Sequence, residues 1–377
     1  MESHSKEVHL ELPSSHRVPI GWLKAHACPS ICLRTVTEIL PQGAATDADL
    51  ADLIGAVREY RGVVQVTKKQ RDSGIWARNM LGVAASKTHN VSDAGTIAQY
   101  RRLLELGLPK EDRPFRIANR TLFRLLSKDG DPALLYEYKK DAAKHSGLGE
   151  WTRELIGEAA TCALAQAGHI MDPRVRGSAH RIATGISQFL RDDLAGDPFV
   201  KKGAKWVLHP DARPPTLFSI ALIAYMPSFQ RERAGLVDRL LRYIGKQPPR
   251  KAWGLQFGRK MLPTNILVLG EPQHADSSGR PKDLPFALHW IELLARLGSL
   301  EHSRTAQRVL TRLLRDCDQD GIWSPKGLRG FQRSSSKLAD FAYPLEIDPK
   351  NSEKRKSDVT FRLALIAKHL GWKLEFV

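Results

Sequence analysis

The sequence predicts an all-α protein of about six helix pairs, with short irregular or strand-like loop insertions. Apolar residues recur at helical spacing, Ser or Asp opens these segments, and Leu-Gly ends them. The chain has 377 residues, 42% of them hydrophobic, enough to bury a large core. We expect a single domain over 1–377, with a polar segment at 1–20 and long loop insertions at 244–282 and 324–356.

The expected helices follow one another in pairs. In the clearest pair, Ser92 and Asp93 precede an apolar pattern that stops at Gly107. Asp112 and Pro114 then open the return helix. The other expected helices cover 47–60 (with a partner around 31–40), 151–167, 173–190, 215–225, 231–243, 283–297 and 306–314, and a last helix opens at Ser357-Asp358 and ends at Leu370-Gly371.

Two turns between helix pairs share a pattern of Gln, a short spacer and Gly-x-Trp. They are 70–76, which ends in Trp76, and 319–323, which ends in Trp323; Gly149-Glu150-Trp151 repeats the last part. Gly supplies a backbone conformation that other residues resist, and Trp covers a junction with a large apolar face. We therefore expect a structural role for these tryptophans rather than ligand stacking.

These turns resemble the QW turns of the terpenoid cyclase and protein prenyltransferase superfamily. The Ser-Asp-x-Thr sequence at 357–360 is similar to the start of that family's inner helices. The resemblance covers roughly residue 47 to the C-terminus as a pattern, and it implies that the helix pairs close into an α/α toroid.

The catalytic residues of the family are not reproduced. The cyclases use an Asp-x-Asp-Asp sequence, whereas Asp47-Ala48-Asp49-Leu50 lacks the final acid and starts a helix. The prenyltransferases hold zinc with Asp, Cys and His, an arrangement that Cys162 and Cys317 do not match. The catalytic residues, if the protein is an enzyme, are therefore unknown from the sequence, and we predict no metal site and no cofactor.

The charge of the chain favours an anionic partner. Lys and Arg number 58 against 41 Asp and Glu, a net charge of +17. Two segments, 241–270 and 321–338, contain no acid, and Lys201, Lys202 and Lys205 form a smaller third cluster. Cations neutralise phosphates and aromatic rings stack on bases. The predicted anion-binding residues are Arg242, Lys246, Arg250, Lys251, Arg259, Lys260, Lys326, Arg329, Arg333 and Lys337, and the predicted stacking residues are Trp253, Phe257 and Phe331.

Two functions follow from these observations. The first is a toroid-type scaffold that binds an anionic partner through basic loops, with nucleic acid as the leading candidate. The alternative is an atypical isoprenoid-diphosphate or lipid-modifying enzyme, with its substrate, such as a phosphorylated lipid, in a central cavity. Aromatic residues make up only 7% of the chain, which weighs against a carbocation-stabilising cavity. A polysaccharide-active barrel is a third option that no spacing selects. No membrane span is expected, and we predict a cytoplasmic protein.

Overall fold

The structure is a computed structural model that describes residues 12–77, 79–82, 95–127, 134–262, 264–327, 334, 339–348 and 351–377. Its α-helices are α1 (Ile20–His26), α2 (Pro29–Arg34), α3 (Asp47–Glu59), α4 (Arg61–Thr67), α5 (Thr96–Glu105), α6 (Arg113–Arg124), α7 (Lys139–Ala142), α8 (Leu148–Gln166), α9 (Pro173–Phe189), α10 (Leu217–Ala224), α11 (Pro227–Glu232), α12 (Ala234–Ile244), α13 (Leu284–Arg296), α14 (Arg304–Arg315) and α15 (Ser352–His369). A π-helical turn, η1 (Thr35–Ile39), continues α2, and η3 (Asp193–Ala195) and η4 (Leu300–His302) are 3-10 turns. The strands are β1 (Ser15–Val18), β2 (Phe199–Lys202), β3 (Lys205–Leu208), β4 (Trp253–Phe257), β5 (Lys260–Leu262) and β6 (Lys373–Phe376).

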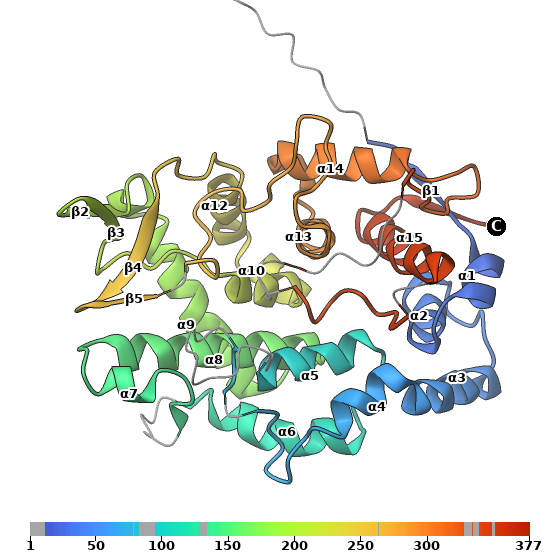
Figure 1. Cartoon of the computed structure of the whole chain (residues 1–377), viewed down its shortest axis with the longest axis horizontal. Coiled ribbons are helices and arrows are strands. Elements are labelled where there is room, and N and C mark those ends of the chain that lie inside the picture. Colours follow the sequence, from blue (N-terminus) through green and yellow to red (C-terminus); the bar gives the residue numbers. More distant parts are fainter. Residues whose placement is uncertain are drawn as a thin grey trace, which may run out of the picture.

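The helices differ in how much of their surface is buried, and the sequence explains the difference. Every residue of α10 is buried, in keeping with its uniformly apolar sequence. In contrast, α14 buries one stripe, formed by Ala306, Val309, Leu310 and Leu313, and turns its arginines outward. In Figure 1, α5, α8, α10, α13 and α15 surround the middle of the molecule, while α6, α14, α3 and α1 lie further out.

Most of the predicted helices are present, and polar caps fix where they start. The helix expected at 47–60 is α3, which Thr46 and Asp49 open with a capping box. Asp172 and Asp283 accept backbone N–H groups at the starts of α9 and α13. The segment expected as one helix at 231–243 is divided between α11 and α12 at Arg233.

The predicted start of the last helix was wrong. Helix α15 begins at Ser352, where the Asn351 side chain accepts the N–H groups of Glu353 and Lys354. Asp358 lies inside the helix and accepts the N–H groups of Leu345 and Glu346 instead, at 2.5 and 3.1 Å. Its carboxylate therefore caps a neighbouring segment rather than its own helix.

The prediction of an all-α fold was also wrong. The described residues are about 52% helical and 9% strand, and they form two sheets. One is a parallel pair, β1 with β6, and the other has the strand order β2-β3-β4-β5. Sequence patterning missed the strands because each has only three to five residues, too few to show an alternating pattern. Of the two expected loop insertions, 244–282 contains β4 and β5, and 324–356 includes the start of α15.

The two Gly-x-Trp turns join helix pairs, as their sequences indicate. Trp76 and Trp323 are buried, with 2% and 5% of their surface exposed. The backbone N–H of Trp76 bonds to Thr96 at the start of α5 (3.1 Å), and that of Trp323 bonds to Thr360 in α15 (2.9 Å). Each turn is thus tied to a threonine of a buried helix, which supports the structural interpretation of both tryptophans.

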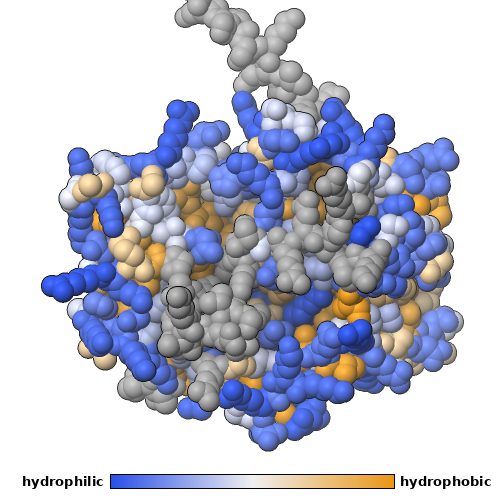
Figure 2. Space-filling view, viewed as in Figure 1, coloured by the Kyte–Doolittle hydropathy of each residue, from blue (hydrophilic) through white to orange (hydrophobic). Residues whose placement is uncertain are grey.

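The face of the molecule drawn in Figure 2 is mostly hydrophilic. On the face drawn in Figure 2, hydrophilic residues crowd the rim and hydrophobic residues show further in, between the helices. Among the described helices, none combines the length and the apolar character needed to cross a bilayer.

Candidate anion-binding sheet and pocket

The four-stranded sheet brings together two basic segments that are far apart in the sequence. Strands β2 and β3 form an antiparallel hairpin that carries Lys201, Lys202 and Lys205. Strand β3 then pairs in parallel with β4, with Trp206 opposite Trp253, and β4 pairs with β5. The hairpin lysines therefore lie on the same sheet as the predicted residues 250–260. We call this sheet, with its flanking residues 250–252 and 258–259, the basic sheet.

The sheet is anchored by its apolar residues and leaves its lysines in solvent. Phe199, Leu208, Leu255 and Leu262 are buried, whereas the three hairpin lysines are exposed. None of the four strands contains an acid. Lys202 and Lys205 stand directly opposite each other across the hairpin. Like charges in this position destabilise a sheet, so an anion at this surface would relieve a repulsion that is built into the fold.

Three of the predicted anion-binding residues already have carboxylate partners. Lys251 lies 3.1 Å from Asp197, and its ammonium also lies over the rings of Phe199 and Trp206, at 4.5 and 4.0 Å from their centroids. Lys260 lies 2.9 Å from Asp141. Arg242 pairs with Asp238 one helical turn earlier on α12. Much of the positive charge of these three side chains is compensated within the protein.

The remaining predicted cations of this region are more accessible. Lys246, Arg250 and Arg259 are exposed and, like the hairpin lysines, have no carboxylate partner within the described chain. The Lys246 ammonium lies 5.6 Å from the centre of the Tyr243 ring. The structure therefore adds the three hairpin lysines to the accessible cations of the predicted site.

The two predicted stacking residues in this region pack against other aromatic side chains. The ring of Trp253 lies 5.4 Å from that of Phe199, and the ring of Phe257 lies 5.7 Å from that of Trp151 on α8. Both are half-buried. Their main role in the structure is to attach the sheet to the helices, and each keeps only part of its surface for a ligand.

The second predicted basic segment is not brought to the basic sheet. Lys326 is exposed and follows the turn at 319–323, where the Arg17 side chain donates a hydrogen bond to the Gln319 carbonyl. Arg17 belongs to β1, which lies on the opposite side of the molecule from β2–β5 in Figure 1. The other predicted residues of this segment, Arg329, Phe331, Arg333 and Lys337, lie outside the described residues.

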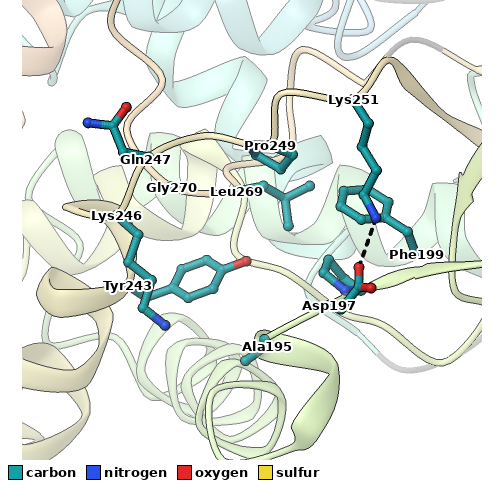
Figure 3. Close-up of a pocket in the computed structure, with 12 residues that line it drawn as sticks. Ala195, Asp197, Phe199, Tyr243, Lys246, Gln247, Pro249, Lys251, Leu269 and Gly270 are labelled. Carbon is teal, nitrogen blue, oxygen red and sulfur yellow. Dashed lines mark hydrogen bonds and ion pairs between the residues drawn. The ribbon is translucent and has the colours of Figure 1, made fainter.

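A pocket of about 430 Å³ opens beside the basic sheet. Its walls come from the end of α12 and the loop that follows, from residues 195–199, and from Leu269 and Gly270. Figure 3 shows Lys246 on one side, Lys251 with Asp197 on the other, and the Tyr243 hydroxyl pointing between them. Sequence analysis identified the two lysines but not the tyrosine, because only the fold shows that Tyr243 borders a hollow.

A cluster of buried charges lies among the inner helices, and sequence analysis missed it. Arg362 on α15 bonds to Glu105 on α5 at 2.6 Å and to Glu292 on α13 at 2.8 Å. Arg34 on α2 also bonds to Glu105, at 2.7 Å, and Arg296 bonds to Glu292 at 3.0 Å. We call these five residues the central charge cluster.

The surrounding arginines determine the protonation of this cluster. Arg362 and Arg34 outweigh the effect of burial and lower the pKa of Glu105 to about 2, and Arg296 and Arg362 lower the pKa of Glu292 as well. Both acids are therefore ionised at neutral pH. A cavity for an isoprenoid or lipid chain needs apolar and aromatic walls, whereas the side chains that meet here are charged. The cluster gives no support to the alternative enzyme function.

Comparisons with family models, with curated proteins and with solved structures find no match to this chain. The resemblance to the toroid superfamily therefore stays an expectation from the turn sequences. Within the described residues, no three His, Cys, Asp or Glu side chains come together in a way that could hold a metal ion.

Proposed function

We propose that this protein is a helical scaffold that binds a polyanion on the basic sheet, and that nucleic acid is the leading candidate for this polyanion. The observation that carries the proposal is the union of two basic segments on one sheet whose strands contain no acid. Five exposed cations of the sheet result, Lys201, Lys202, Lys205, Arg250 and Arg259, and the exposed Lys246 lies beside them. A cytoplasmic location remains a prediction from the sequence.

The physical basis is the release of counterions. A nucleic-acid backbone carries a condensed layer of cations, and lysines or arginines that neutralise its phosphates set those ions free. Binding of this kind weakens steeply as the salt concentration rises and depends little on base sequence. The half-buried positions of Trp253 and Phe257 agree with a site that recognises backbone charge more than bases.

The test is a titration of a labelled single strand at several salt concentrations. We expect the wild-type affinity to fall linearly on a log–log plot, by a slope of about 0.7 for each neutralised phosphate. Reversing the hairpin charges with Lys201→Glu, Lys202→Glu and Lys205→Glu should lower the affinity at least tenfold at low salt. The magnitude of the log–log salt slope should decrease by up to about 2, because three contacts between lysine and phosphate are lost.

A matched control separates a local site from a general effect of net charge. Lys68, Lys69 and Arg71 are exposed cations next to α4, away from the basic sheet in Figure 1. Reversing these three changes the net charge by the same amount and should reduce binding far less. Equal losses of affinity in the two triple variants would rule out the basic sheet as the site. Wild-type affinity that does not change with salt concentration would rule it out as well.

A further inference from the structure

The pocket beside the basic sheet differs from the surface around it in how its groups are arranged. Its volume of about 430 Å³ lies within the range of roughly 300–1,000 Å³ that small-molecule sites occupy. Leu269, Pro249 and Phe199 form apolar parts of its wall, and Lys246 and Lys251 contribute cations. Such a pocket has room for a single nucleotide unit, which an open lysine surface cannot enclose.

We propose that this pocket binds the terminal nucleotide of a nucleic-acid strand through its phosphate monoester. The inference rests on the proposed function and deepens it, because it assigns strand ends to the pocket and internal backbone to the exposed lysines. Lys246 and Lys251 approach from two sides, and the Tyr243 hydroxyl points between them.

The charges favour a terminal phosphate over an internal one. A phosphate monoester carries close to two negative charges at neutral pH, whereas an internal phosphodiester carries one. Asp197 already compensates Lys251 at 3.1 Å. Asp197 also lines the pocket, so Lys246, Lys251 and Asp197 together give the wall a net charge of +1, which attracts a dianion more strongly than a monoanion. Lys246 has no carboxylate partner within the described chain. An internal phosphodiester, with its single negative charge, is attracted less strongly to the same place.

Tyr243 supplies the directional contact. Only 6% of its surface is exposed, and its ring packs edge-on against Phe189, which fixes its position. Its hydroxyl makes no hydrogen bond to another described residue. Burial raises the pKa of Tyr243, so the phenol keeps its proton at neutral pH and can donate it to a phosphate oxygen. The apolar wall at Leu269 and Pro249 then faces the sugar and base.

The experiment compares four single strands of one sequence. The first strand carries a 5′-phosphate, the second a 3′-phosphate, and the third has hydroxyl groups at both ends. The fourth strand is closed into a circle. We expect wild-type protein to bind one of the two phosphorylated strands about tenfold more tightly than the hydroxyl-ended and circular strands. A free nucleoside monophosphate should remove this preference by occupying the pocket.

Variants link the preference to the pocket. Tyr243→Phe removes only the hydroxyl, and Lys246→Met removes the free cation; each should reduce the preference to less than threefold. Arg250→Met is the matched control, since it removes a cation of the basic sheet outside the pocket and should weaken all four strands alike. Equal wild-type affinity for all four strands overturns this inference and leaves polyanion binding standing. Failure to bind any strand overturns the proposed function itself.

Discussion

At the scale of single residues, the glycines of the two Gly-x-Trp turns are required by close backbone contacts. Gly74 and Gly321 have φ angles of +83° and +88°, which side-chain-bearing residues rarely adopt. A Cβ at Gly74 would meet the Ile117 carbonyl oxygen at 2.7 Å, and one at Gly321 would overlap the carbonyl oxygen of Arg17. The turns thus hold neighbouring segments at distances that only glycine allows.

We expect Gly321→Ala to be more destabilising than its backbone angle alone would predict. Gly298 is the matched control: it has a φ of +62° and open space around its Cβ position. Gly298→Ala should cost about 1–2 kcal/mol for the left-handed conformation. Gly321→Ala should lower the free energy of unfolding by at least about 1 kcal/mol more, because the methyl group must displace the backbone of Arg17. Denaturant unfolding measures both values, and equal costs would contradict the close contact.

At the scale of elements, the central charge cluster connects helices that the chain separates widely. Arg362 alone bridges α5, α13 and α15, and it is only 1% exposed. Burying such charges costs several kcal/mol per ion, so the cluster contributes little net stability. Its geometry instead makes one arrangement of the helices far better than others, since any shift leaves a buried charge without a partner.

Arg362→Met tests this role. The substitution keeps a similar volume but leaves Glu105 and Glu292 each with one partner fewer, and we expect a loss of about 3–5 kcal/mol in the free energy of unfolding. Arg242→Met, which removes an exposed arginine paired within α12, should stay close to wild type. If Arg362→Met were as stable as Arg242→Met, the cluster would not constrain the arrangement of the helices.

Sequence analysis predicted the elements much better than their contacts. Helix starts at Thr46, Asp172 and Asp283 could be predicted because a cap and an apolar stripe are local signals. The basic sheet could not, since its strands are short and its central pair, β3 with β4, is separated by more than forty residues that include three helices. The cluster left a signal that was overlooked: Glu105, Glu292 and Arg362 are single charges inside apolar stretches.

At the scale of the whole molecule, buried acids set how stability depends on pH. Burial raises the pKa of Glu346 to about 7, with Asp358 adding to the effect and Lys354 opposing it. Burial likewise raises the pKa of Glu137 to about 7 and that of Glu158 to about 6. Because these folded values exceed the unfolded value of about 4.3, the stability that the neutral acids confer is complete below that value and is lost as the pH rises to about 7.

We therefore expect Glu346→Gln to flatten this dependence. The free energy of unfolding of the wild type, relative to the variant, should fall by about 3 kcal/mol between pH 4.5 and 7.5 because only the wild type must ionise Glu346. Glu111→Gln changes an exposed residue, so its free energy of unfolding should differ from that of the wild type by a constant amount across this pH range. Chemical denaturation across this pH range is the measurement, and a constant difference between wild type and Glu346→Gln would contradict the raised pKa.

The parallel pairing of β1 with β6 has a consequence for biosynthesis. A nascent chain presents Ser15–Val18 early, yet its hydrogen-bonding partners at Lys373–Phe376 are translated much later. During elongation, the ribosome therefore carries a protein with an unsatisfied strand edge, open to pairing with other chains. A premature stop before residue 373 leaves that edge permanently unpaired, so truncated products should be prone to aggregate even though most of their helices can form.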